Sequence, residues 1–335
     1  MPAAFRPPPR AARRTRRYLA RVNAASPTAG HRRFGGLAAY AWCVLAYNLA
    51  VVAWGAFVRA TGSGAGCGSH WPLCNGEVVP REPAIETLIE LTHRLTSGLA
   101  AVAVFLLAWL VFRACPRGDP ARRVAIAAAL LMVIEALLGA GLVLFGWVED
   151  DASWGRVASL GLHLMNTFVL LAAIALTAWR LSGGPANRWR TGTRESTLVA
   201  LTLGLMLAVG ITGAMTALGD TLFPSTSLTE GIRQDFVATS HFLVRLRVIH
   251  PALALITALV VLFSASALAR RRPTRATISL ARLTRTLIVL QVIGGFANLA
   301  LLAPTWMQLV HLLHADLTWL SLVLLGAAAL APDPP

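Results

Sequence analysis

The stretch IETLIELTHRLTSGLAAVAVFLLAWLVF, residues 85–112, decides the fold. Its length and apolar composition are those of a helix that crosses a lipid bilayer, for which about 20 residues are enough. The first third of the stretch nevertheless carries an acid, an imidazole and a guanidinium, on Glu90, His93 and Arg94. Ionisable side chains are costly inside a bilayer, so they usually face the interior of a helix bundle and mark a functional site. This segment therefore predicts a polar site within a membrane protein.

The composition of the whole chain agrees with this interpretation. Of 335 residues, 56% are hydrophobic and only 13% are charged, which is too apolar for a soluble domain of this length. We therefore predict an all-α integral membrane protein that spans the lipid bilayer with about eight transmembrane helices. The predicted spans lie near residues 37–58, 86–112, 124–147, 157–179, 196–218, 242–269, 277–302 and 307–331.

The distribution of arginine predicts the orientation. All thirty basic residues are arginines, and they cluster in the N-terminal segment and in alternate loops, whereas the intervening loops hold most of the acids. Arginine-rich loops stay on the cytoplasmic side, so both termini are expected in the cytoplasm. The net charge of +15 is then a topology signal, and we expect no nucleic-acid partner. Arginine without lysine, with abundant alanine, is typical of a GC-rich bacterial genome and favours a bacterial plasma membrane.

The two halves of the chain resemble each other, which predicts two pseudo-repeated four-helix bundles. The matched residues are Gly55 and Gly213, His93 and His250, Glu135 and Gln291, and His163 and His311. The expected division is an arginine-rich cytoplasmic tail at 1–36, an N-terminal half at 37–180, a cytoplasmic linker at 181–195, a C-terminal half at 196–331 and a short cytoplasmic tail at 332–335.

Each half has one histidine on its second predicted helix and one on its fourth. Two histidines from opposing helices of a bundle are the usual axial ligands of a six-coordinate haem. A zinc site would need three or four converging ligands, and a di-iron site would need more carboxylates. We therefore expect one haem between His93 and His163 and another between His250 and His311. His314, one turn after His311, is an alternative ligand.

The two predicted haem sites differ in their charged neighbours. Glu90 and His93 lie on one face of a helix because they are three residues apart. In the second half Arg247 occupies the place of Glu90, and Arg245 and Arg247 would suit haem propionates. A carboxylate in one half alone suggests a substrate site there and a resident cofactor in the other half. The alternative for Glu90 is a structural salt bridge to Arg94.

Two cysteines lie in the predicted outer loop after the first helix. Cys67 and Cys74 enclose six residues rich in turn formers on the oxidising side of the membrane, which favours a disulfide. The spacing is compatible with a structural staple and with a redox role. No Cys-x-x-Cys-His sequence is present, so the pair does not predict a c-type haem.

These motifs together resemble the haem A synthases, the CtaA/Cox15 family of membrane oxidoreductases. The resemblance rests on GAFVRATGSGAGCGSHWPLCNG at residues 55–76, on the sequence Glu90-x-x-His93, and on three further histidines in order. It covers nearly everything from about residue 37 to residue 331. The resemblance implies an enzyme that oxidises the C8 methyl of haem O to the formyl group of haem A, which supplies cytochrome oxidase.

The resemblance also implies roles for individual residues. Substrate haem O would lie between His93 and His163, and a haem b cofactor would lie between His250 and His311. Glu90 matches the essential acid of the family, and Cys67 with Cys74 matches its outer-loop cysteine pair. The implied partners are a haem O synthase and an electron acceptor such as a quinone, with water or dioxygen as the oxygen source. A homo-oligomer is compatible with all of these expectations.

A second function would use the same histidines. A dihaem b-type electron-transfer cytochrome linked to quinone would hold two haems permanently, but it would have no need for Glu90 in one half only. The asymmetry between the halves favours the oxidising enzyme.

Overall fold

The computed structural model describes residues 35–185 and 192–332, so the predicted tails at 1–36 and 332–335 lie almost wholly outside the described residues. Within those ranges the chain is helical, without a β-strand, and eight helices are long and apolar enough to cross a membrane. They are α3 (Gly35–Ala60), α4 (Ile85–Ala114), α5 (Pro120–Leu144), α6 (Trp154–Leu181), α7 (Arg194–Leu222), α10 (Ile249–Arg271) with the short α9 (Phe242–Leu246) before it, α11 (Arg275–Ala300) and α12 (Thr305–Ala329). The predicted all-α multi-pass membrane protein is confirmed.

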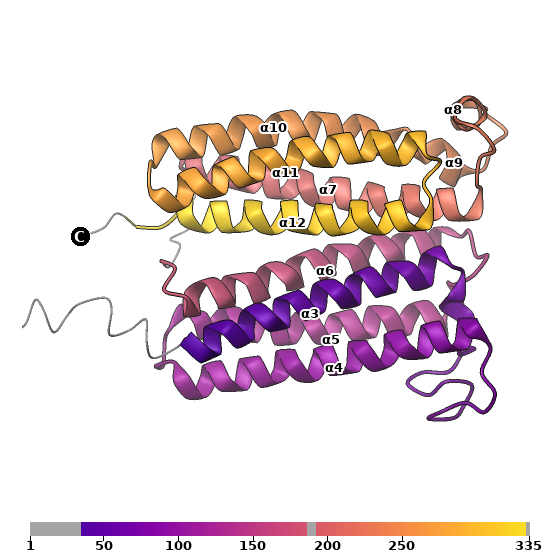
Figure 1. Ribbon diagram of the computed structural model, residues 1–335, viewed down its shortest axis with the longest axis horizontal. Coiled ribbons are helices and arrows are strands. Elements are labelled where there is room, and N and C mark those ends of the chain that lie inside the picture. Colours follow the sequence, from indigo (N-terminus) through magenta and orange to yellow (C-terminus); the bar gives the residue numbers. More distant parts are fainter. Residues whose placement is uncertain (1–34, 186–191, 333–335) are drawn as a thin grey trace, which may run out of the picture.

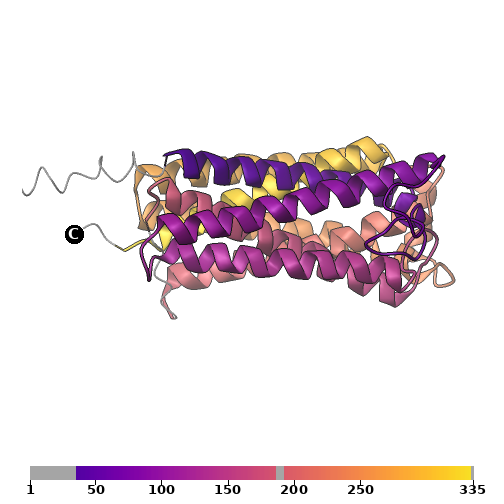
Figure 2. The same cartoon turned by 90° about the horizontal axis from the view of Figure 1, so that it is seen from below.

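The eight helices form two groups of four (Figure 1). Helices α3 to α6 pack around one another in one group, and α7, α10, α11 and α12 pack around one another in the second group. All the long axes run in nearly the same direction when the molecule is turned (Figure 2). This grouping agrees with the two predicted bundles, and the sequence repeat behind it stays a prediction.

Local sequence explains where several helices begin. Asp119 caps α5 by accepting a hydrogen bond from the backbone of Ala121, and Pro120 at the first helical position suits that start. Ser153 caps α6 in the same way, and Thr274 with Thr277 forms a reciprocal capping box on α11. These caps lie in the short connections, so each helix can begin directly after its turn.

The centre of the molecule lies where the two groups meet, at α6 and α12. These two helices are the most buried of the membrane spans. Phe168 on α6 stacks on Trp319 on α12 with their ring centroids 5.3 Å apart, and Trp319 Nε1 donates a hydrogen bond to the Phe168 carbonyl. The apolar side chains on the outside of the other helices are exposed, as expected for surfaces that face lipid tails.

Arg59, in the last turn of α3, joins the two groups of helices. Its guanidinium donates to the carbonyl of Ala217 at 2.9 Å and to Thr221 Oγ1 at 2.8 Å, both on α7. It also donates to Gln308 Oε1 on α12 at 2.8 Å. One side chain of the first group therefore fixes the position of two helices of the second.

We expect Arg59→Ala to lower the stability of the chain by about 2 kcal/mol, because half-buried acceptors on α7 and α12 lose a charged donor. Thermal unfolding of the purified protein in detergent, followed by circular dichroism, measures the effect. Arg123→Ala is the control, because Arg123 is exposed on α5. Equal melting temperatures for the two variants would contradict the bridging role of Arg59.

Candidate functional site

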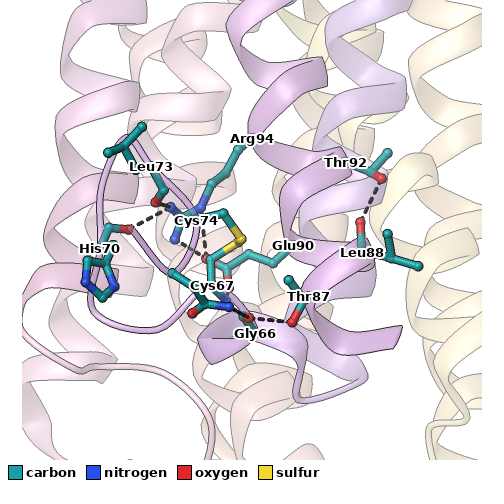
Figure 3. The surroundings of a disulfide bond; sticks show 11 residues. Gly66, Cys67, His70, Leu73, Cys74, Thr87, Leu88, Glu90, Thr92 and Arg94 are labelled. Atoms are coloured by element: carbon teal, nitrogen blue, oxygen red, sulfur yellow. Dashed lines mark hydrogen bonds and ion pairs between the residues drawn. A yellow bond between two sulfur atoms is a disulfide. The ribbon is translucent and has the colours of Figure 1, made fainter. Parts of the chain in front are cut away.

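The loop between α3 and α4 folds back against the start of α4. Cys67 and Cys74 form the predicted disulfide, and both sulfur-bearing side chains are buried. The loop is also closed by backbone hydrogen bonds, from Asn75 N–H to the Cys67 carbonyl and between Cys74 and Glu77 in both directions. The side chain of Glu90 on α4 lies beside this closed loop (Figure 3).

Glu90 is buried, with 3% of its surface exposed. Its Oε2 accepts a hydrogen bond from the backbone N–H of Cys67 at 2.7 Å. Its Oε1 accepts from Arg94, at 3.0 Å from Nε and 2.5 Å from the terminal nitrogen Nη2. The salt bridge to Arg94, expected as an alternative role, is therefore present together with a bond to the loop.

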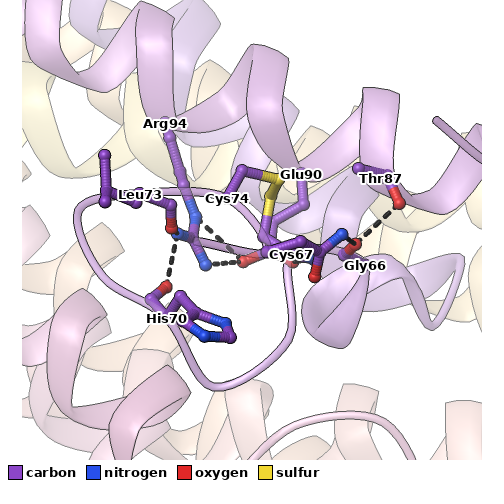
Figure 4. Close-up of polar contacts among 9 residues, drawn as sticks. Gly66, Cys67, His70, Leu73, Cys74, Thr87, Glu90 and Arg94 are labelled. Carbon is purple, nitrogen blue, oxygen red and sulfur yellow. Dashed lines mark hydrogen bonds and ion pairs between the residues drawn. A yellow bond between two sulfur atoms is a disulfide. The ribbon is translucent and has the colours of Figure 1, made fainter. Parts of the chain in front are cut away.

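Arg94 also holds the loop directly. Its remaining terminal nitrogen, Nη1, donates to the carbonyl of His70 at 2.7 Å and to that of Leu73 at 2.6 Å, and both residues lie inside the disulfide-closed segment (Figure 4). Sequence reasoning missed these contacts, because nothing in the spacing of Arg94 predicts which carbonyls it will reach. Glu90, Arg94 and the loop between the cysteines thus form one hydrogen-bonded unit near the start of α4.

His93 on α4 and His163 on α6 are close enough to interact electrostatically. The ring of His93 packs against α3 at Gly55, and a Cβ added to this glycine would lie only 2.9 Å from the ring. Its Nδ1 is buried and has no hydrogen-bond partner among the described residues. The absence of a side chain at Gly55 therefore lets the imidazole of His93 pack directly against α3.

His163 has an acidic partner that sequence reasoning did not pair with it. Glu135 on α5 places Oε1 at 3.4 Å from His163 Nδ1. The same carboxylate accepts hydrogen bonds from Asn166 at 2.5 Å and from Thr167. Carboxylates that contact the second nitrogen of a ligating histidine fix its orientation and raise its basicity. The repeat had matched Glu135 with Gln291, but only the packing of α5 on α6 brings it to His163.

The second group presents a similar pair. His250 on α10 and His311 on α12 are close enough to interact electrostatically. The ring of His250 packs on α7, where a Cβ at Gly213 would lie 3.0 Å away, and the ring of His311 lies beside Gly295 of α11. Thr212 Oγ1 lies 3.3 Å from His250 Nδ1. Both groups of helices therefore bring together the two histidines that the sequence predicts.

Gln291 on α11 distinguishes His311 from His314. Its amide nitrogen lies 3.2 Å from His311 Nε2, and its Oε1 lies 2.9 Å from His314 Nδ1. His314 thus contacts Gln291 as Asn166 contacts Glu135 in the other group. His311, which lies near His250, corresponds to His163. The geometry favours His311 as the ligand and His314 as a supporting group.

Arg247 is buried and is engaged by the protein itself. It donates to the carbonyls of Gly219 at 3.0 Å and Phe223 at 2.6 Å, and its Nε lies 3.3 Å from Asp220 Oδ1. Burial raises the pKa of Asp235 on α8 (Leu228–Phe236), and the positive charge of Arg247 opposes that rise. Arg245 is exposed. The contact between these arginines and haem propionates stays a prediction. A propionate that binds Arg247 would compete with Asp220 and with the two carbonyls for the guanidinium.

The donor set fits haem better than a bare metal ion. Across residues 35–185 and 192–332, no group of three or more histidine, cysteine, aspartate or glutamate side chains is arranged to hold a metal ion. Two facing imidazoles are enough for haem, because the porphyrin supplies the other four ligands. Cys43 and Cys115 are free thiols.

We expect reduction of the disulfide to loosen the loop around Glu90. A disulfide that closes so short a loop contributes roughly 2 to 3 kcal/mol, so amide exchange in residues 63–78 should speed up by roughly tenfold or more. Hydrogen–deuterium exchange with mass spectrometry, before and after a thiol reductant, measures this. The loop at 145–153 lacks cysteine and is the internal control. Unchanged exchange in 63–78 would show that the hydrogen bonds alone hold the loop.

Known proteins similar to this chain come from haem synthesis. The chain is 51% identical over 296 residues to a protein of Thermus thermophilus named Protoheme IX farnesyltransferase. The aligned region is 88% of this chain and 48% of the relative. It is also 42% identical over 128 residues to the Heme A synthase of Alkalihalophilus pseudofirmus, and that aligned region is 38% of this chain and 40% of the relative. The chain therefore spans about half or less of the length of these relatives.

The family model described as cytochrome oxidase assembly protein matches residues 38–323. That range contains the disulfide loop, Glu90 and all four paired histidines. With these residues in place on an eight-helix scaffold, the chain belongs to the COX15-CtaA family of cytochrome oxidase assembly proteins.

Proposed function

We propose that this protein is a haem A synthase, a membrane oxidoreductase that converts the C8 methyl of haem O to a formyl group. The observation that carries the proposal is the buried Glu90 carboxylate, held one helical turn from His93 in one group of helices only. Arg247 stands in the corresponding place of the other group and is occupied with backbone carbonyls. Family membership and the relatives named Heme A synthase support the same reaction.

The substrate would bind between α4 and α6. His93 and His163 would hold the iron of haem O as neutral imidazoles, with Glu135 orienting the His163 ring. With its iron held by these two residues, the porphyrin would stay close to Glu90, which lies one helical turn from His93 on α4. Holding a reacting carbon close to a catalytic group removes much of the entropic barrier to reaction.

The resident cofactor would bind between α10 and α12. His250 and His311 are the proposed ligands of haem b, with Gln291 supporting His311. Haem b would supply one-electron transfer, from the substrate toward a quinone or another acceptor in the membrane. The neutral amide of Gln291 replaces the acid Glu135 of the substrate site, so the two pairs of ligands differ in the charge beside them.

Glu90 is the group we assign to the reaction itself. Oxidation of the methyl by two electrons gives a hydroxymethyl, and a second two-electron oxidation gives a geminal diol, which loses water to leave the aldehyde. Four electrons and four protons leave when water supplies the oxygen. A carboxylate beside the carbon stabilises the positive charge that develops there, or accepts a proton from the attacking water. Arg94 and the Cys67 N–H keep the carboxylate in place.

The remaining expectations follow from this proposal. The helix ends that carry Arg113, Arg180 and Arg270 lie at the end of the bundle away from the disulfide loop, which supports a cytoplasmic location for that end in a bacterial plasma membrane. The halves at 37–180 and 196–331, joined by a linker at 181–195, would each bind one haem. An enzyme that farnesylates protohaem would supply the substrate, and the match to a protein with that name supports a shared pathway.

We expect Glu90→Gln to abolish formyl production, with a loss of roughly a hundredfold or more. The amide oxygen can still accept from Cys67 N–H, although the bonds from Arg94 to the second oxygen are lost. Arg94 keeps its bonds to the His70 and Leu73 carbonyls, so the loop should keep its structure while the negative charge is lost. The chain is co-expressed with a haem O synthase in a bacterium that makes no haem A, and extracted haems are identified by chromatography and mass spectrometry.

The matched control is Glu86→Gln, one turn earlier and exposed on α4. This variant should make haem A at the rate of the unmodified chain. Normal haem A formation by Glu90→Gln would refute the assigned role. Only haem b and unchanged haem O from folded, haem-loaded unmodified protein would instead favour a dihaem electron-transfer cytochrome.

We expect His250→Ala and His311→Ala each to remove haem b, because a six-coordinate haem loses one of its two protein ligands. His314→Ala should keep haem b, because His314 is assigned as a supporting group that contacts Gln291. Haem content per mole of purified protein, measured by the pyridine spectrum, tests both statements. Full haem b in His250→Ala would show that the two halves have been assigned the wrong way round.

A further inference from the structure

A basic groove lies between α10 and α11, near the short turn that connects them and away from both proposed haem sites. It has a volume of about 290 Å³. Its polar lining consists of Arg270 and Ser266 on α10 and of Arg282 and Arg285 on α11. The two helices are direct neighbours in the bundle (Figure 1). Three guanidinium groups therefore surround one hollow on the outside of a membrane-spanning bundle.

These three arginines have no acidic partner among the described residues. The one side-chain contact within the groove is a long one, 3.5 Å from Arg285 to Ser266 Oγ. Arg271, next in sequence to Arg270, shows the contrast, because it forms an ion pair with Glu195. The groove thus holds an excess of positive charge that the surrounding protein does not neutralise.

The arginines on α11 reach deep into the membrane span. Arg282 and Arg285 lie about 10 Å and about 15 Å along the helix from Arg275, at 1.5 Å per residue. A helix of 26 residues is about 39 Å long, while the hydrocarbon layer is about 30 Å thick. With the helix centred, Arg285 begins roughly 10 Å inside the hydrocarbon. Both side chains are exposed, and an exposed charge at that depth needs an anion or a path to the headgroups.

The architecture of the bundle does not itself require these charges. Helix α5 has the same place in the other group of helices, as third in order. Its residues 124–134 read VAIAAALLMVI and contain no charged side chain. The basic groove is therefore a feature of the second group alone.

We propose that this groove binds an anionic phospholipid, with its phosphate on the three guanidinium groups and its acyl chains against the apolar floor. Ala269, Ile278 and Ala281 form that floor. Guanidinium groups pair with phosphate oxygens in bidentate fashion, and basic pockets between transmembrane helices at the cytoplasmic side bind such headgroups. Three cations at one groove favour a headgroup with two phosphates, such as that of a diphosphatidylglycerol.

The test uses the full chain, purified in detergent and stripped of lipid. Binding of diphosphatidylglycerol, phosphatidylglycerol and phosphatidylcholine is measured by native mass spectrometry and by the rise in melting temperature. We compare Arg282→Gln/Arg285→Gln with Arg117→Gln/Arg123→Gln, which removes the same charge from exposed positions of the first group. At about 1 kcal/mol per arginine, the groove variant should bind anionic lipid roughly 30-fold more weakly.

The control variant and the unmodified chain should bind anionic lipid equally, and phosphatidylcholine should bind weakly to all three proteins. Equal affinity of the groove variant and the control variant for anionic lipid would overturn the proposal. Inorganic phosphate is tested separately, and stabilisation by phosphate alone as large as that by lipid would assign the groove to a soluble anion instead. Haem content is measured in parallel, because the proposal does not depend on the enzyme activity.

Discussion

The rest of this structure depends on one constraint, that charge and unpaired polar groups are costly in hydrocarbon. The backbone meets it by forming helices across the whole span. Several charged side chains meet it by pairing. Arg94 forms an ion pair with Glu90, and Glu135 lies beside His163. Arg247 pairs with Asp220 and donates hydrogen bonds to two backbone carbonyls. Each pair sits at an interface between helices or between a helix and a loop, so meeting the constraint also fixes the arrangement of the bundle.

Near the start of α4, beside the disulfide loop, this pairing holds the Glu90 carboxylate in a fixed position. Glu90 accepts three hydrogen bonds, one from the loop backbone and two from Arg94. Arg94 is itself held by hydrogen bonds to carbonyls inside the disulfide loop. A carboxylate held in this way pays no further ordering cost when a substrate arrives. The disulfide therefore matters to the proposed chemistry through geometry, whether or not it also exchanges electrons.

The two groups of helices use the same plan for different purposes. Both place two histidines on opposing helices and a glycine against an imidazole. The first adds acids, Glu90 and Glu135, whereas the second has Arg247 and Gln291 in the matching places. We propose that the differences at these few positions separate a reacting haem in the first group from an electron-carrying haem in the second.

The sequence by itself determined the class of the protein, the eight spans and the disulfide, and it predicted which histidines form pairs. These follow from composition, from hydrophobic length and from residue types whose chemistry restricts their use. It could not supply the partners of those residues. Only the tertiary structure decided that Glu135 meets His163, that Arg94 holds the loop, that Arg59 ties the groups together and that three arginines share one groove. The reason is physical, because such contacts depend on how helices distant in sequence rotate and pack, and a hydrophobic span constrains length much more than rotation.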